Sequence, residues 1–232
     1  WMSEYEFEEL PQYAQICQAA KRIGDYATQH GVRLTFHPGP FNILGSNKAD
    51  VVRRTMKELR QHSQVFDLMG FEPSYYNNIN IHIGAAYKDK QAVLDQWCEN
   101  YEKLDENTRK RLTIENDDKP SLYNTQDLHT GVYSMVGIPI VFDYHHHTCH
   151  SGDLSCREAL ELAISTWPKQ VKPVVHYSSA RQIEDPKAKV QAHADYVYEE
   201  INTYGYDVDI ELEVKMKEKA LLQYREKFSI LS

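Results

Sequence analysis

Several features that would define a protein class are missing from this sequence. Its 232 residues contain no run of about 18 apolar residues, which excludes a transmembrane helix. The first residues have neither a basic segment nor an apolar segment, so no secretory signal is predicted. Met2 lies behind Trp1, which indicates that the natural N-terminus lies elsewhere.

Cysteine is scarce, and its spacing excludes a disulfide-rich scaffold. The four residues, Cys17, Cys98, Cys149 and Cys156, are scattered and form no CxxC pair. Without a signal peptide, this pattern predicts reduced thiols in an intracellular protein of the cytoplasm or nucleus, depending on the host. Cys149 and Cys156 lie near a histidine cluster, which leaves a zinc role open.

An excess of positive charge is also missing. The 26 Lys and Arg residues are outnumbered by 34 Asp and Glu residues, and the formal net charge of −8 excludes a simple basic protein that coats DNA. It does not exclude a nucleic-acid enzyme whose carboxylates are held by bound cations. The 41% hydrophobic and 26% charged residues are typical of a globular chain and argue against disorder.

Short β-rich segments alternate with segments of helical periodicity. Alternation of this kind predicts a parallel sheet with right-handed crossovers, and the absence of a low-complexity linker favours one domain over residues 1–232. Glycines 31 and 70 are placed to end two of the helices. The predicted strands are 33–36, 78–81, 111–114, 138–142, 173–175 and 208–212, and the predicted helices are 4–30, 49–69, 88–107, 154–165, 189–204 and 215–228.

Each predicted strand ends near a residue that can bind a metal ion. Because the carboxyl ends of parallel strands meet at one face, these side chains are expected to converge. Imidazoles and carboxylates together suit Zn²⁺, Mn²⁺ or Fe²⁺, and more than four ligands indicate two or three ions. The residues, in chain order, are His37, His82, Glu115, Asp143 with the block His145, His146 and His147, then His176, Glu211 and Glu213.

Alternatives remain at several of these positions. A single histidine at a strand end is more often a hydrogen-bonded core residue, and only the succession of six strands favours metal. Strand alternation would place His145 and His147 on the same face as Asp143, whereas a turn after Asp143 would bring His146 inward. His193 is equally compatible with a ligand and with a surface residue.

The motifs at the strand ends resemble the UV damage endonuclease family. They occur in the family's order and span nearly the whole chain. The resemblance implies a TIM-type (β/α) barrel similar to the apurinic endonucleases, nicking of DNA immediately 5′ of UV photoproducts or other lesions, and a Mn²⁺-favouring cluster of two or three divalent ions, with Zn²⁺ also possible. The motifs are LTFHPG (34–39), NIHIG (80–84), LTIEND (112–117), VFDYHH (141–146), VHYS (175–178) and LEVK (212–215).

The resemblance also implies roles for individual residues. It favours His146 over His145 and Glu213 over Glu211, and it gives catalytic roles to Glu115, Asp143, His176 and Glu213. The implied metal ligands are His37, His82, Glu115, Asp143, His146, His176, His193 and Glu213.

The sequence departs from the family pattern in three respects. The family barrel has eight strands and only six are identifiable, so the fold is expected to be incomplete at its N-terminus, with two strands before Trp1. Pro40 and Phe41 stand where the family often has glutamine and an aromatic residue that probe the lesion; Phe41 can still stack on bases. Val174 occupies the place of a lysine that can be modified in family members.

The leading prediction is therefore a monomeric, metal-dependent endonuclease of DNA excision repair acting on damaged double-stranded DNA, with no membrane partner. Two alternatives remain: a barrel-fold, metal-dependent sugar isomerase or epimerase, favoured mildly by the negative charge, and a non-catalytic paralogue that binds damaged DNA. The residues predicted to contact DNA are Pro40, Phe41, Tyr87, Lys90, Ser178 and Arg181.

Overall fold

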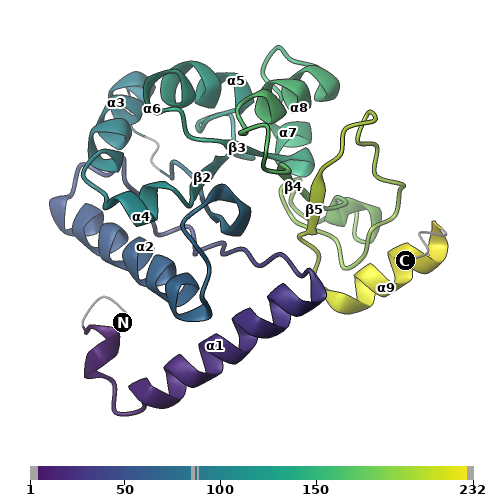
Figure 1. Cartoon of the computed structure of the whole chain (residues 1–232). Helices are drawn as coiled ribbons and strands as arrows, with labels where there is room; N and C mark the ends of the chain where they lie inside the picture. Colours follow the sequence, from purple (N-terminus) through teal and green to yellow (C-terminus); the bar gives the residue numbers. More distant parts are fainter. Residues whose placement is uncertain (1–4, 85–86, 88, 229–232) are drawn as a thin grey trace. The chain divides into compact units, whose positions relative to one another are not determined.

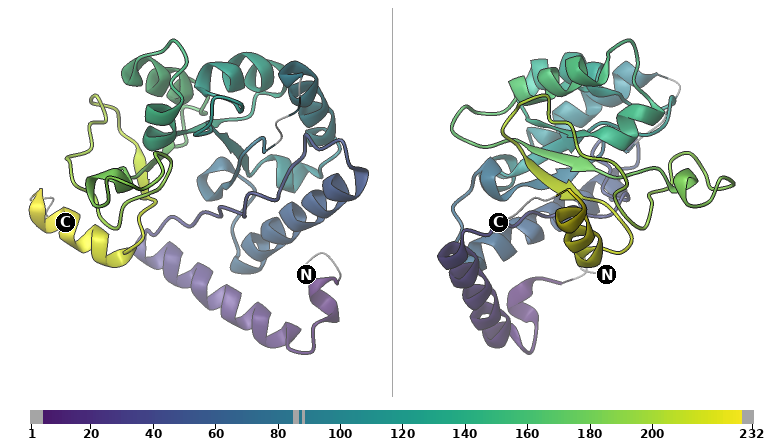
Figure 2. Two further views of the ribbon diagram at one scale, coloured as in Figure 1. Left: turned by 180° about the vertical axis from the view of Figure 1, so that it is seen from behind. Right: turned by 90° about the vertical axis from the view of Figure 1, so that its right-hand side faces the viewer.

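The computed structural model describes residues 5–84, 87 and 89–228, and within these the chain forms two compact units (Figures 1 and 2). The first unit takes in Trp1–Ile114 and Gly131–Pro139, and the second takes in Glu115–Thr130 and Ile140–Ser232. The expectation of strands before Trp1 falls outside the described residues. No helix within the described residues has both the length and the apolarity needed to cross a bilayer.

The first unit contains most of the helical residues of the N-terminal half. Its elements are the 3₁₀ turn η2 (Phe7–Glu9), α1 (Tyr13–His30), α2 (Ala49–Met69), η3 (Tyr75–Asn77), β1 (Ile79–Ile81), α3 (Lys90–Tyr101), α4 (Glu106–Arg109), β2 (Leu112–Glu115) and α6 (Ser134–Val136).

The second unit contains the remaining strands and the C-terminal helix. Its elements are α5 (Thr125–Leu128), β3 (Ile140–Asp143), α7 (Tyr144–Cys149), α8 (Cys156–Ser165), β4 (Val174–Tyr177), the 3₁₀ turn η5 (Arg181–Ile183), β5 (Asp209–Leu212) and α9 (Glu218–Lys227). A π-helical turn, η4 (His129–Tyr133), spans the junction between α5 and α6.

Parallel pairing in the first unit brings two strand ends side by side. Strands β1 and β2 run parallel, with Ile79 opposite Leu112 and Ile81 opposite Ile114. The predicted strand 33–36 is wrong as a full strand, because only Phe36 forms a bridge, to Ile79. The Phe36 N–H donates to the Asn78 carbonyl, and the Asn80 N–H donates to the Phe36 carbonyl. These two bonds hold the chain just before His37 beside β1.

Helices α1 and α2 pack against each other in the first unit (Figure 1). The two C-terminal caps predicted from glycine are confirmed, since Gly31 and Gly70 have φ values of 63° and 86°. Gly24 permits the close approach of the helices, because a Cβ at that position would lie 1.8 Å from the carbonyl oxygen of Met69.

The fully buried guanidinium of Arg111 stabilises the same unit. It donates to Asp67 Oδ1 at 2.8 Å, to the Phe71 carbonyl at 2.6 Å and to Asn107 Oδ1 at 3.0 Å. These bonds tie the start of β2 to the end of α2 and to the segment that follows it. A buried charge is tolerated only with such pairing.

A parallel sheet of β3, β4 and β5 forms the core of the second unit. Phe142 lies opposite Val175, and Val174 lies opposite Asp209. Helices α5, α7 and α8 pack on β3, and β3 and β4 are buried along their whole length, as expected for parallel strands covered on both faces. Trp167, after α8, donates its indole N–H to the Ile140 carbonyl at 2.7 Å and so fixes the start of β3.

The structure differs from the sequence prediction in two segments of the second unit. The helix predicted over 189–204 is wrong: this segment is an extended loop without a helix. Conversely, α7 begins directly after β3, where no helix was predicted. Helix α8 begins at its Ser155 N-cap, whose side chain and that of Glu158 form a capping box.

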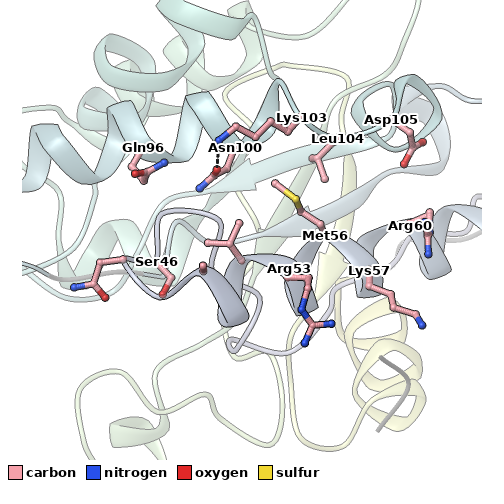
Figure 3. Close-up of a pocket in the computed structure, with 13 residues that line it drawn as sticks. Ser46, Arg53, Met56, Lys57, Arg60, Gln96, Asn100, Lys103, Leu104 and Asp105 are labelled. Atoms are coloured by element: carbon pink, nitrogen blue, oxygen red, sulfur yellow. Dashed lines mark hydrogen bonds between the residues drawn. The ribbon is translucent and has the colours of Figure 1, made fainter. Parts of the chain in front are cut away.

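A pocket of about 710 Å³ lies beside α2 and α3 in the first unit (Figure 3). Met56 reaches toward Leu104 across it, whereas Lys57 and Arg60 point away and pair with Glu6 at 3.0 and 3.2 Å. None of the predicted metal ligands or DNA contacts lines this pocket.

Candidate metal centre

Strand register in the second unit brings three predicted ligands together. Asp143, the last residue of β3, lies directly opposite His176 of β4. The ladder of β4 and β5 continues one residue beyond β5, because the Glu213 N–H donates to the Tyr177 carbonyl at 2.9 Å. The expected convergence at the carboxyl ends of the strands is therefore present in this unit.

Asn116 fixes Glu115 beside the end of β3. Its side-chain amide donates to the Asp143 carbonyl at 3.0 Å, and its Oδ1 accepts the Asp143 N–H at 2.9 Å. Asn116 is fully buried, so this two-way contact replaces backbone pairing at the end of the strands. Sequence reasoning missed this residue, although it directly follows Glu115 in the LTIEND motif.

Helix α7 fixes the direction of His146 within the 145–147 block. Asp143 is the N-cap of this helix, and its Oδ1 accepts the His146 N–H at 2.6 Å. Helical geometry then turns His146 inward, so that its Nδ1 lies 3.1 Å from Glu115 Oε1. His145 and His147 are also buried, and burial lowers the pKa of both imidazoles.

His176 lies among three carboxylates. Its Nδ1 is 3.2 Å from Glu115 Oε2 and 2.9 Å from Glu213 Oε1. Its Nε2 is 3.4 Å from Glu211 Oε2, so both glutamates at the end of β5 contact this imidazole.

His193 completes the cluster from the loop between β4 and β5. Its Nδ1 lies 2.8 Å from the Glu213 carbonyl and 3.7 Å from Glu213 Oε2. Ligand atoms of His146, His193 and Glu213 all lie within 4.8 Å of one another, and so do those of Glu115, Asp143, His146 and Glu213. Either group could hold a metal ion, and the two groups share His146 and Glu213.

Without a cation, protons balance the carboxylates. Burial lowers the pKa of His146, but Asp143 and Glu115 outweigh it and raise the pKa to about 10. Burial opposes the charge on His176 in the same way, yet Glu115, Glu211 and Glu213 raise its pKa well above 6.5. Burial raises the pKa of Asp143. The site thus requires positive charge, which protons supply when no metal is bound.

The orientation of the side chains fits metal binding. His146 and His193 each place Nδ1 at hydrogen-bond distance from a backbone carbonyl; a proton on Nδ1 would then leave Nε2 as the nitrogen that could bind an ion. Asp143 Oδ2 is buried and, within the described residues, has no hydrogen-bond donor. Such an oxygen needs a cation or a proton.

His37 and His82 lie together in the first unit. Their ring centroids are 5.6 Å apart, and His37 Nδ1 is 3.0 Å from the Asn80 carbonyl. His37 therefore has the same Nδ1-to-carbonyl orientation as His146 and His193. The role of this pair as metal ligands stays a prediction.

The predicted DNA contacts differ in accessibility. Phe41 is 78% exposed and Tyr87 is 42% exposed, and Tyr87 donates its hydroxyl to Asn47. Pro40 is exposed, and Lys90 is the partly exposed first residue of α3. These four residues belong to the first unit.

The two predicted contacts in the second unit are less open to solvent. Ser178 is buried, and its hydroxyl has no hydrogen-bond partner among the described residues. Arg181 forms ion pairs with Glu184 and Asp195. A DNA-contacting role for these two residues, as for the four in the first unit, stays a prediction.

Comparison with known proteins assigns the chain to a family. The model of the UV-endonuclease UvdE family matches residues 7–231. The chain belongs to this family. The UV DNA damage endonuclease of Bacillus pumilus (strain SAFR-032) is 34% identical to it over 219 residues, which cover 90% of this chain and 66% of the relative. The corresponding enzyme of Bacillus mycoides (strain KBAB4) is 33% identical over 195 residues, covering 84% of this chain and 58% of the relative.

The chain thus spans 58 to 66% of the length of these UvdE relatives. Among solved structures, SacUVDE matches 99% of this chain and 77% of its own, with a TM-score of 0.85 and 31% sequence identity. L-ribulose 3-epimerase matches 92% of this chain with a TM-score of 0.60 and 12% identity, which shows the fold alone. The TIM-type α/β fold class and the resemblance to the UV damage endonucleases are confirmed.

Proposed function

We propose that this UvdE family member is a metal-dependent repair endonuclease that nicks the backbone of damaged double-stranded DNA on the 5′ side of UV photoproducts or other lesions. The supporting observation is the cluster of four buried residues, Glu115, Asp143, His146 and His176, with the half-buried Glu213 and His193 beside them. Its oxygen and imidazole donors suit Mn²⁺, and Zn²⁺ is the second choice. The overlapping ligand groups support two or three ions.

Each residue of the cluster contributes by binding and orientation. Glu115 contacts both His146 and His176 through its two oxygens, so it is placed to bridge neighbouring ions. Asn116 holds the backbone of Asp143, the His146 N–H holds Asp143 Oδ1, and the buried Oδ2 would be the oxygen that binds an ion. When bound, divalent ions would supply Lewis-acid stabilisation of phosphate oxygens and activate water at neutral pH.

Phe41 supports the choice of a DNA substrate. Its ring is 78% exposed and is therefore accessible to a base, which can stack on such a side chain. Pro40, Tyr87 and Lys90 from the same unit would add apolar and cationic contacts to the duplex. We expect the protein to bind the duplex as a monomer.

The function is tested with a duplex that carries one defined photoproduct on an end-labelled strand. We expect a single nick immediately 5′ of the lesion in the presence of Mn²⁺ and none with a chelator. Glu115→Gln should abolish nicking, because it removes the carboxylate shared by two histidines. Glu161→Gln, on the surface of α8 in the same unit, is the matched control and should cut normally.

Four outcomes would contradict the proposal. Cleavage of an undamaged abasic duplex with the photoproduct duplex left intact would show a different substrate. Activity retained in Glu115→Gln would remove Glu115 from the mechanism. DNA binding without cutting, together with a substoichiometric metal content, would favour a non-catalytic paralogue, whereas conversion of a ketose with no salt-dependent DNA binding would favour an epimerase.

A further inference from the structure

His193 is held differently from the other candidate ligands. Glu115, Asp143 and His176 end or belong to buried strands, and Glu213 directly follows β5. His193 instead lies in the 178–208 loop, where the structure has only the short turn η5 and one bridge, between Ala180 and His193. A metal ligand has to be held to within about 0.5 Å, so a loop residue needs additional restraints.

Backbone hydrogen bonds provide the first restraint. The Arg181 N–H donates to the Ala192 carbonyl at 2.7 Å, and the Ala194 N–H donates to the Ser179 carbonyl at 2.9 Å. On the other side, the Lys215 N–H donates to the Ala194 carbonyl at 3.1 Å. The backbone around His193 therefore lies between the segment after β4 and the segment after β5.

Side chains provide a second restraint. The Arg181 guanidinium pairs with Glu184 Oε2 at 2.8 Å and with Asp195 Oδ1, two residues after His193. Glu184 Oε1 in turn accepts the Asp195 N–H at 2.7 Å and the Tyr198 hydroxyl at 2.7 Å. Arg181 thus joins the carboxylates of Glu184 and Asp195, and Glu184 also accepts the backbone N–H of Asp195.

We propose that Arg181, acting through Asp195 and Glu184, is a positioning residue that holds His193 in place as a metal ligand. This inference rests on the metal centre of the proposed function. Two carboxylates already neutralise the guanidinium, which weakens its attraction for a DNA phosphate. Without Arg181, Asp195 and Glu184 would face each other as like charges, and their repulsion would displace the chain that carries His193.

The test measures Co²⁺ binding by its visible absorption, independently of DNA cleavage. Arg181→Met should weaken the binding of one ion at least tenfold and shift the spectrum toward that of His193→Ala. Arg181→Lys, which keeps the charge, should recover most of the affinity. Arg157→Met is the matched control: it removes the exposed pair with Glu161 on α8 and should leave binding unchanged.

A double variant separates positioning from a general loss of structure. Once His193 is replaced by alanine, adding Arg181→Met should not weaken Co²⁺ binding further. A further loss in this double variant would show that Arg181 acts on the whole cluster and would overturn the proposal. If Arg181→Met does not fold, Asp195→Asn is the second variant and should lower the Co²⁺ affinity in the same direction.

Contrary results are distinguishable. Wild-type Co²⁺ binding by Arg181→Met would overturn the positioning role. If Arg181→Met also reduces by about one the slope of log K for DNA binding against log salt concentration, Arg181 would be assigned to a phosphate contact instead. Absence of Co²⁺ binding by the wild-type protein would overturn the metal centre itself, and with it both proposals.

Discussion

Asp143 has two roles that a single substitution can separate. Oδ1 accepts the His146 N–H as the N-cap of α7, whereas Oδ2 is buried and, in the described part of the chain, has no hydrogen-bond donor. Asparagine is as good an N-cap as aspartate, but it lacks the anionic oxygen that a divalent cation prefers. Asp143→Asn should therefore keep the fold and lose metal binding.

The expected magnitudes follow from these contacts. In chelator, Asp143→Asn should change the free energy of unfolding by less than about 1 kcal/mol, because the cap remains and the relieved repulsion from Glu115 and Glu213 offsets the lost attraction to the protonated His146 and His176. At a metal concentration of about 100 times Kd, the wild-type protein gains about 2.7 kcal/mol. If the variant binds about 100-fold more weakly, its gain falls to about 0.4 kcal/mol.

Thermal unfolding with and without Mn²⁺ measures this difference. For a chain of this size, about 1 kcal/mol corresponds to about 2–4 °C in Tm, so the metal-induced shift should decrease by about 5–9 °C in Asp143→Asn. Asp143→Ala is the control for the cap. It should lose the same metal response and, in addition, about 1 kcal/mol in chelator.

Two results would refute this reasoning. A wild-type metal response in both variants would show that Asp143 is not a ligand. A loss of several kcal/mol by Asp143→Asn in chelator would show that the carboxylate is needed for folding rather than for metal.

Three further predictions concern charge and burial. Arg111→Met should lower the free energy of unfolding by about 3–5 kcal/mol in urea titrations, because it leaves the partly buried Phe71 carbonyl, Asn107 and Asp67 without their donor; a loss below about 1 kcal/mol would contradict this role. The Cys98 side chain is only 3% exposed, and burial raises the pKa of its thiol to about 11. Ellman's reagent at pH 8 should therefore modify Cys98 only after unfolding, and rapid reaction of the native protein would count against this packing. The protonated form of His146 stabilises the metal-free fold fully below about pH 6.5, and this stabilisation is lost as the pH rises through about 10. Because metal binding must release this proton, the metal affinity measured by chelator competition should increase from pH 7 to 9. An affinity that does not change over this pH range would exclude proton release.

Local patterns in the sequence determined much of the fold. Helix α2 was predicted with its observed bounds, because an apolar stripe and a C-terminal glycine are local signals. The segments that form β1 to β4 were located for a similar reason, since parallel strands buried on both faces require short runs of apolar residues. The convergence of Asp143, His176 and Glu213 followed from the rule that parallel strands end at one face.

The outcome at other positions depended on contacts between distant segments. The inward position of His146 requires a helix that starts at Asp143, and short histidine-rich segments carry no periodicity that distinguishes helix from strand. The 189–204 segment has helical spacing, yet its backbone bonds to the ends of β4 and β5 outweigh that local preference.

The chain's residue types and order thus determined which groups can bind a metal and on which strands they lie. Tertiary structure alone decided how they are held: Asn116 beside Asp143, and Arg181 between Glu184 and Asp195. The physical reason is that ligand types are chosen by local chemistry, whereas their orientation depends on hydrogen bonds and ion pairs between residues that meet only in the folded protein.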